Sequence, residues 1–304
     1  MTVRRGTYSI VGRDPATGQL GVAVQSHWFS VGSIVSWARP GVGAVATQSI
    51  AEPAYGPRLL DRLDAGEEPE AALAAETEAD DLADVRQVAV IDASGRVAAH
   101  TGERCIAFAG DQAGEGFSAQ ANMMASPEVW PAMASAFETT EGTLARRLLA
   151  ALEAAEDAGG DVRGRQSAAI VVVGPEGEPW EREVELRVED AELPLAELRR
   201  LLDLHDAYAL ADRADALAGE GRHEEAARLY IDAAAAAPAN VELAFWAGLG
   251  LAAGGQVGVG AARVRGVISI DRAWVRLLAR LDPEIAPGAD AVRESLGVAR
   301  EQDA

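Results

Sequence analysis

The stretch RRGTYSIVGRDPATGQLGVAVQSHW, residues 4–28, predicts two β-strands joined by a tight turn. The strands are Thr7–Gly12 and Leu20–Ser26, and the connecting DPATG has the Pro and Gly typical of a β-hairpin. In the second strand large apolar residues alternate with small ones, so one face is apolar and the other leaves room for a close neighbour. The hairpin therefore begins with a hydroxyl residue that directly follows Gly6.

The net charge of −21 excludes two classes of partner. Nucleic acids and anionic membrane surfaces both attract basic proteins, so we expect neither as a partner of this chain. All 27 basic residues are Arg, and the sequence has no Lys. With 304 residues, 49% of them hydrophobic, the chain can bury the core of one large domain or of two domains.

The sequence predicts no metal site, disulfide or membrane span. Cys105 is the single cysteine, and the four histidines have no metal-ligand spacing. The uncharged run 243–262 is long enough to cross a bilayer, but its six glycines and one Gln favour soluble helices. The leading MTVRR lacks the apolar segment of a signal peptide, so we expect a cytoplasmic protein.

Runs of strands alternate with pairs of helices in the remaining pattern. Further strands are predicted at 33–38, 43–48, 87–92, 96–101, 105–109, 116–120, 167–173 and 183–188, and helices at 57–63, 69–79, 126–137 and 143–158. This order excludes a doubly wound parallel sheet. We predict an α+β domain over residues 1–192, a four-layer αββα sandwich in which two antiparallel sheets stack and a helical pair covers each outer face.

Residues 193–304 are predicted to form a small all-α unit. Its spacing of small, aromatic and Pro residues resembles a degenerate tetratricopeptide repeat, with the pattern Ala214, Leu217, Ala226, Tyr230, Ala233 and Pro238, and then Gly248 and Leu251. The second copy has Arg272 where the Pro is expected. So few repeats cannot build a long groove, so we expect the unit to pack on its own domain or on a second subunit, as in a homo-oligomer.

Four motifs carry a resemblance to a known family. TYSIVGRDPATGQLGVAVQS, VGAVATQS, AHTGERC and GRQSAAIVVV follow one another as in the bacterial and archaeal domain of unknown function 1028 family, over about residues 7–190. The order of strands and helices, with the Gly6–Thr7 junction, is similar to the N-terminal-nucleophile (Ntn) hydrolase fold. The resemblance implies that cleavage before Thr7 frees an α-amine that acts as general base for its own hydroxyl.

Thr7 is accordingly the candidate nucleophile. A free α-amine has a pKa of about 8, suitable for a general base, and Gly6 removes a side chain from the bond to be broken. Alternatively, Thr7 merely begins a strand because of its β propensity, and Thr2 is a weaker candidate. The resemblance implies that Asp161 and Ser167 support the amine.

Candidate substrate-binding residues come from turns that lead to the same sheet edge. They are Ser26, His27, Gln48, Asn122, Arg163 and Gln166. The turn after Gln48 is expected to supply backbone N–H groups to an oxyanion. Asp161 and Arg163 have an alternative explanation, a helix-ending turn stabilised by an ion pair.

The main departure from the working enzymes of this fold concerns the residue beside the nucleophile. Those enzymes commonly place a Lys beside it, and here only Arg39, Arg163 or Arg165 could replace that Lys. An Arg cannot act by losing its proton. Cys105 is expected to be a half-buried structural residue, because nothing in the sequence suggests a lowered thiol pKa.

These observations predict a hydrolase that acts on an amide or related C–N bond of a small molecule or short peptide, with no cofactor or metal. The alternative is a catalytically silent module that binds a ligand or assembles through its helical C-terminal unit. The two hypotheses predict different masses for the purified chain, because only the enzyme loses residues 1–6.

Overall fold

The chain divides into two compact units, residues 1–200 and 201–304. The computed structural model describes residues 6–301. The first unit holds two antiparallel sheets with helices, and the second is entirely helical over the described residues. The prediction of an α+β region with antiparallel sheets, followed by a helical region, is confirmed.

A six-stranded antiparallel sheet is built around the predicted hairpin. Its order is β10-β9-β2-β1-β8-β7. The strands are β1 (Thr7–Arg13), β2 (Leu20–Ser26), β7 (Gly110–Gly114), β8 (Phe117–Asn122), β9 (Ser167–Val173) and β10 (Val184–Val188). β1 lies in the middle, and its first residue, Thr7, pairs with Ser26 on one side and Asn122 on the other.

The second sheet has four antiparallel strands in the order β3-β4-β5-β6. They are β3 (Ser36–Arg39), β4 (Gly43–Ser49), β5 (Arg86–Asp92) and β6 (Val97–Thr101). Gln48 of β4 pairs with Gln87 of β5. Because side chains alternate along a strand, both glutamines lie on the same face of this sheet as Ala46 and Ala89.

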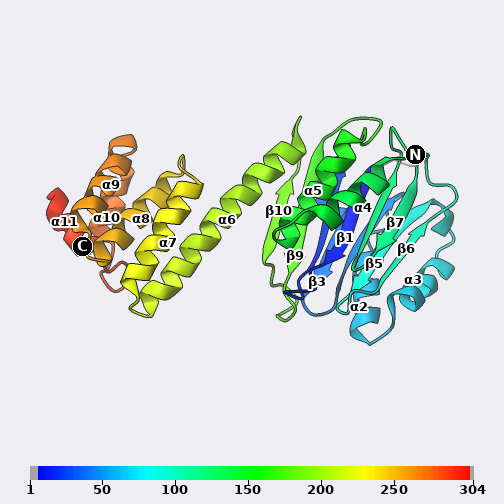
Figure 1. The fold of residues 1–304 in the computed structure, drawn as a ribbon, viewed down its shortest axis with the longest axis horizontal. Helices are drawn as coiled ribbons and strands as arrows, with labels where there is room; N and C mark the ends of the chain where they lie inside the picture. The colour runs from blue at the N-terminus through cyan, green and yellow to red at the C-terminus, as the bar shows by residue number, and fades with distance from the viewer. Residues whose placement is uncertain (1–5, 302–304) are drawn as a thin grey trace. The chain divides into compact units, whose positions relative to one another are not determined.

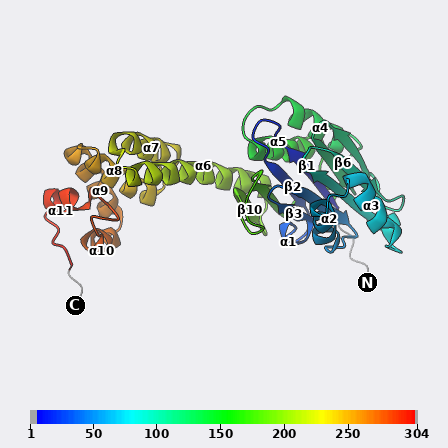
Figure 2. The same cartoon turned by 90° about the horizontal axis from the view of Figure 1, so that it is seen from below.

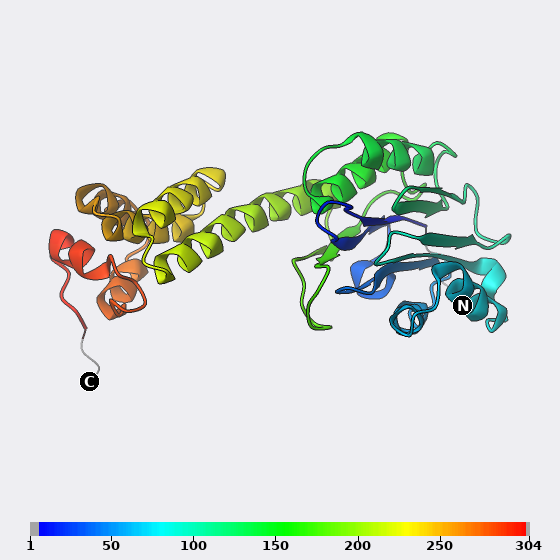
Figure 3. The ribbon, with the colours of Figure 1, turned by 60° about the horizontal axis from the view of Figure 1, so that its bottom comes forward.

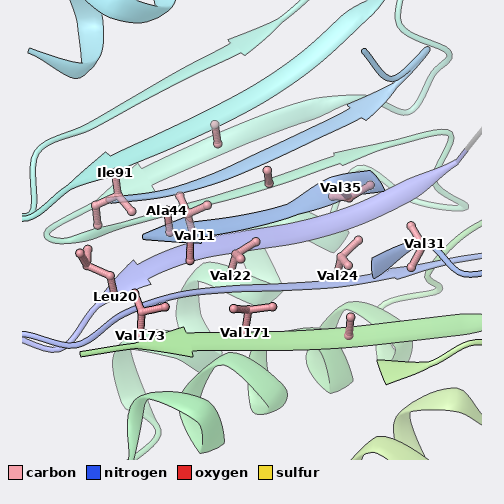
Figure 4. Packing of buried hydrophobic residues seen from close by; sticks show 14 residues of the cluster. Val11, Leu20, Val22, Val24, Val31, Val35, Ala44, Ile91, Val171 and Val173 are labelled. Atoms are coloured by element: carbon pink, nitrogen blue, oxygen red, sulfur yellow. The ribbon is translucent and has the colours of Figure 1, made fainter. Parts of the chain in front are cut away.

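The two sheets face each other across an apolar layer. Val11 and Val22 from the first sheet and Ala44 and Ile91 from the second belong to one buried cluster. Figure 4 shows these side chains pointing into the space between the sheets. Burial of apolar surface at about 25 cal/mol per Å² makes this layer a main source of stability.

Helices cover the outer faces of both sheets, as Figures 1 and 3 show. α4 (Val129–Thr139) and α5 (Leu144–Asp157) pack on the six-stranded sheet, where the Phe117 and Phe137 rings lie 5.0 Å apart. α2 (Tyr55–Asp64) and α3 (Pro69–Glu78) pack on the four-stranded sheet. The helices at 57–63, 69–79, 126–137 and 143–158 therefore form as predicted, with ends that differ by up to three residues.

Two predicted strands are wrong, one in part and one entirely. The segment predicted as a strand at 33–38 begins with a helical turn, α1 (Gly32–Val35), which buries Val31 and Val35 four residues apart. The segment 105–109 is not a strand, and the edge strand β7 follows it instead. β7 is largely exposed and lacks large apolar side chains, so its sequence carries no strand pattern.

The second unit consists of successive packed helices (Figure 2). α6 (Pro194–Gly219) runs through the boundary between the units and is followed by α7 (His223–Ala236), α8 (Val241–Ala253), α9 (Val257–Ile270), α10 (Ala273–Arg280) and α11 (Ala289–Leu296). Ala214, Ala226, Tyr230 and Ala233 are buried in one cluster. The uncharged run 243–262 is split between α8 and α9, and within residues 6–301 no helix has the length and apolar character that a membrane span requires.

Candidate functional site

Polar side chains replace apolar ones at one end of the layer between the sheets. Thr7, Ser26, Gln48, Gln87 and Asn122 come from five different strands, and each is at most 1% exposed. On β1, β2, β4 and β5 they continue the inward-facing positions that elsewhere carry valine, alanine and isoleucine. We call these five residues the polar cluster.

Gln87 holds the polar cluster together. Its Oε1 accepts hydrogen bonds from Gln48 Nε2 at 2.8 Å and from Asn122 Nδ2 at 2.9 Å. Its Nε2 donates to the Ala121 carbonyl at 2.9 Å. The same Gln48 and Asn122 amides lie 3.3 Å from the Thr7 carbonyl oxygen, so the network fixes the start of β1.

Sequence reasoning missed Gln87. The signal was available, because Gln87 precedes Ala89 and Ile91 by two and four residues and must share their inward face. For Gln48, the contact toward Thr7 comes from the side-chain amide, where the sequence suggested backbone N–H groups.

A chain of hydroxyl groups connects Thr7 to the carbonyl before it. Thr7 Oγ1 donates to Ser26 Oγ at 3.1 Å, and Ser26 Oγ donates to the carbonyl oxygen of Gly6. Arg163 Nη2 donates to the same carbonyl oxygen at 2.8 Å. The carbonyl oxygen of the Gly6–Thr7 peptide group thus accepts two hydrogen bonds, and the hydroxyl of Thr7 is attached to the residue on the other side of the bond.

Asp161 fixes Arg163 in this position. Its side chain is fully buried and contacts the guanidinium through Oδ2–Nη2 at 2.7 Å and Oδ1–Nε at 3.0 Å. The backbone N–H of His27 donates to Asp161 Oδ2 at 3.1 Å. A Cβ on Gly6 would lie 2.8–2.9 Å from this carboxylate, so a larger residue would have to displace Asp161. The predicted ion pair of Asp161 and Arg163 is therefore present, and it lies against the Gly6–Thr7 bond.

Two glycines and a β-bridge determine the position of the turn that carries Asp161. Gly159 and Gly160 after α5 have φ values of +119° and +57°, which glycine adopts without strain. Asp161 then forms an isolated β-bridge with Met124, and Val162 N–H donates to the Met123 carbonyl at 3.2 Å. The turn is thereby attached to the end of the strand that carries Asn122.

Two non-glycine residues with positive φ border the polar cluster. Ser49 directly follows Gln48 with φ +69°, and Met123 directly follows Asn122 with φ +59°. Such conformations cost about 1–3 kcal/mol each and concentrate at functional sites. A strained residue therefore ends β4, and another directly follows β8 at the same edge.

On the opposite face of β1, Tyr8 ties the strand to α5. Its hydroxyl donates to Glu156 Oε2 at 2.7 Å, and Glu156 also pairs with Arg165 at 2.7 Å. Burial raises the pKa of the Tyr8 phenol well above its usual value, and the Glu156 charge adds to this effect. Tyr8 is thus a neutral donor at the pH of a cell.

Three of the predicted side chains do not reach Thr7. Ser167 Oγ accepts from Val31 N–H at 3.0 Å and donates to the Trp28 carbonyl, so it holds the loop after β2. The His27 ring is exposed, 3.2 Å from the Arg165 carbonyl. Gln166 donates to Asp190 at 3.1 Å on the surface.

Of the three arginines considered as a replacement for Lys, only Arg163 contacts the Gly6–Thr7 bond. Arg39 pairs with Asp61 at 2.7 Å and Arg165 pairs with Glu156. Cys105 is half-buried, and burial raises the pKa of its thiol, as expected for a structural cysteine. Thr2 lies outside the described residues. Within residues 6–301, no three His, Cys, Asp or Glu side chains form a group that could hold a metal ion.

Comparison with known proteins agrees with the motif resemblance. Residues 7–198 match the model of the family of unknown function DUF1028. The crystal structure of protein SPO2555 from Silicibacter pomeroyi, assigned to DUF1028, is similar with a TM-score of 0.60 and 34% identity, over 65% of this chain and 88% of that chain. No curated protein matches the sequence. The matched residues include the whole polar cluster, Asp161 and Arg163, and this chain belongs to the family of unknown function DUF1028.

Proposed function

We propose that this chain is a self-processing Ntn-type hydrolase with Thr7 as its nucleophile, and that its first unit is the four-layer αββα sandwich of such enzymes. The observation that carries the proposal is the environment of the Gly6 carbonyl. Arg163 Nη2 and Ser26 Oγ both donate to that oxygen, and the Thr7 hydroxyl lies 3.1 Å from Ser26 Oγ. Donors placed on a carbonyl oxygen stabilise the negative charge that develops when its carbon is attacked.

The first step is cleavage of the Gly6–Thr7 bond. Thr7 Oγ1 attacks the Gly6 carbonyl carbon, and the resulting oxyanion is held by Arg163 and Ser26. The hydroxyl proton is transferred to the Thr7 nitrogen as the C–N bond breaks, which leaves an ester between Gly6 and Thr7 Oγ1. Water hydrolyses the ester, so that the leader departs with the Gly6 carboxylate and Thr7 keeps a hydroxyl and a free amine.

The second activity is hydrolysis of an external amide by the freed Thr7. The amine takes the hydroxyl proton as Oγ1 attacks the substrate carbonyl carbon, and then gives the proton to the departing nitrogen, which leaves an ester on Thr7 Oγ1. Water hydrolyses this ester, so that the acid is released and the Thr7 hydroxyl is restored. After departure of Gly6, Arg163 Nη2, still held by Asp161, and Ser26 Oγ can donate to the substrate oxygen. The permanent charge of Arg163 favours the neutral form of the nearby amine, the task that a Lys performs in related enzymes.

Intact mass of freshly purified protein tests the proposal. We expect the wild type to begin at Thr7 and Thr7→Ala to retain Gly6. Ser9→Ala is the matched control, because Ser9 is a buried hydroxyl residue of the same strand that accepts a hydrogen bond from Gln120 Nε2 at 2.6 Å. It should be cleaved like the wild type. A folded wild-type chain that begins at Met1 or Thr2 would reject the proposal.

A panel of small amides and short peptides then tests the second activity. Processed wild type should hydrolyse at least one C–N bond of the panel, and Thr7→Ala should hydrolyse none. Activity that is equal in the two proteins would show that Thr7 is not the nucleophile.

The alternative is a catalytically silent module in which the Gly6–Thr7 bond stays intact. Thr7 is only 1% exposed while Gly6 is in place, so the uncleaved chain cannot bring a substrate to the hydroxyl. Such a module would stay uncleaved and would assemble through its helical C-terminal unit. Light scattering on the uncleaved Thr7→Ala protein would show that assembly as a mass of two or more chains.

A further inference from the structure

The helical unit contains a cavity of about 460 Å³ that is far along the chain from Thr7. It is lined by residues of α6, α7 and α8 and by the segment 284–288. Pockets that bind small organic ligands commonly have volumes of about 300–1,000 Å³. The family match ends at residue 198, so this cavity belongs to the part of the chain that the family does not cover.

Carboxylates line the cavity without a neutralising arginine. The four acidic lining residues are Asp212, Asp215, Glu242 and Glu284, and the lining includes no Arg. Several carboxylates elsewhere in this unit pair with guanidinium groups, such as Glu225 with Arg222 and Asp290 with Arg293. The four lining carboxylates belong to solvent-exposed residues. Within residues 6–301, the side chains of Asp212 and Glu284 have no hydrogen-bond or ion-pair partner.

Aromatic rings lie among these carboxylates. Tyr208, Tyr230 and Trp246 all line the cavity. The Tyr208 hydroxyl donates to Glu242 at 2.7 Å and the Tyr230 hydroxyl donates to Asp215, so both phenols are held in place by acidic neighbours. A cation over such a ring is attracted to its face, most strongly over Trp.

His223 also lines the cavity, but its Nδ1 is buried, so a ligand in the cavity does not contact that atom. The cavity therefore combines negative charge with aromatic faces. Both suit a ligand that carries a positive charge.

We propose that this cavity binds an organic cation, a compound or side chain with a guanidinium or ammonium group on an apolar stem. The stem would contact the aromatic rings, and the charged group would lie between Asp212 and Glu284. An anion would be repelled by the four carboxylates. A neutral apolar ligand would contact the rings but would not be attracted by the carboxylates.

Isothermal titration calorimetry with the full chain tests the proposal. The probes are agmatine, the blocked tripeptide acetyl-Gly-Arg-Gly-amide, and the same tripeptide with citrulline, whose urea group has the shape of guanidinium but no charge. We expect at least one guanidinium probe to bind about tenfold more tightly than the citrulline peptide, with an affinity that falls as salt is raised.

The variant Asp212→Asn/Glu284→Gln removes two charges and breaks no hydrogen bond of either side chain. We expect it to weaken binding of the guanidinium probe by about tenfold or more. Glu294→Gln, an exposed acidic residue of α11 outside the cavity lining, is the matched control and should change affinity less than about twofold. Circular dichroism melting of each variant checks that the helical unit remains folded.

The pattern of binding distinguishes the sources of the cation. Agmatine binding without tripeptide binding supports a free small cation, and tighter tripeptide binding supports an arginine of a protein segment. Absence of binding by both guanidinium probes overturns the proposal. Equal affinity for the citrulline and arginine peptides, or full affinity in the double variant, overturns it as well.

Discussion

The layer between the two sheets has an apolar half and a polar half, and the same strands supply both. β1 contributes Val11 to the first and Thr7 to the second, and β5 contributes Ile91 and Gln87 in the same way. Along each strand these side chains all point into the layer between the sheets, but they change from apolar to polar. The comparison shows that one pair of sheets can use part of the layer between them for stability and the rest to surround the Gly6–Thr7 bond.

The polar half is a costly way to fill an interior. Its amide donors are paired, but Gln48 Oε1 and Asn122 Oδ1 accept no hydrogen bond within the described residues. Replacing such groups with apolar side chains of similar volume is often neutral or stabilising in other proteins. The arrangement is therefore better explained by its position around Gly6 and Thr7 than by any gain in stability.

The largest expected effect tests the apolar half. Ile91→Ala should destabilise the first unit by about 2–5 kcal/mol, because it removes buried methyl groups and leaves a cavity between the sheets. Urea unfolding measures the loss. Cleavage before Thr7 should proceed normally at temperatures where the variant is folded, since Ile91 belongs to the apolar cluster.

Leu82→Ala is the control for this prediction. Leu82 is 49% exposed, so the change should alter the free energy of unfolding by less than about 0.5 kcal/mol. If Ile91→Ala unfolds as the wild type does, the apolar half is not the main source of stability. If the folded variant fails to cleave, the two halves are not separable.

The second prediction tests the polar half through Arg163. Arg163→Lys keeps the charge but loses the two-point contact with Asp161, so the donor on the Gly6 oxygen is displaced. We expect cleavage to slow by about 10²–10³-fold, the usual effect of losing one oxyanion donor. A mass-spectrometric time course after translation measures the rate. Arg187→Lys on β10, whose guanidinium pairs with Glu189, should cleave at the wild-type rate.

The third prediction concerns Gln87, which serves both stability and the site. Gln87→Leu removes the shortest hydrogen bonds of the buried Gln48 and Asn122 amides and leaves them only their 3.3 Å contacts with backbone carbonyl oxygens. The free energy of unfolding should fall by about 1–3 kcal/mol. Cleavage should also slow, because the Thr7 carbonyl loses its fixed neighbours. A variant as stable as the wild type would mean that the amides find other partners or water.

The sequence predicted more of the fold than of the site. Alternation and turn residues located the β1–β2 hairpin, and helix patterns located the four covering helices, because these signals are local. β7 was missed because it is an exposed edge without apolar residues. At the site, Ser26, Asn122, Asp161 and Arg163 do surround Gly6 and Thr7. Ser167 and Gln166 point elsewhere, because their direction depends on the path of the loops after β2 and β10, which no local pattern encodes.

The smallest expected effect concerns the other face of β2. Gln25 alternates with Val24 and Ser26, so it points away from the layer between the sheets. It is fully buried, and neither polar atom of its amide has a partner within the described residues. Gln25→Met keeps the volume and removes this cost, so we expect a gain of about 1 kcal/mol in the free energy of unfolding, with unchanged cleavage.

Gln112→Met on the exposed strand β7 is the matched control and should change stability by less than about 0.5 kcal/mol. Should Gln25→Met destabilise the protein instead, the amide must be hydrogen-bonded by a buried water. The polar region would then extend through the six-stranded sheet to its helical side, where Tyr8 meets Glu156. In that event the polar residues that matter for cleavage would lie on both faces of the six-stranded sheet. A cleavage defect in Gln25→Met would show this directly.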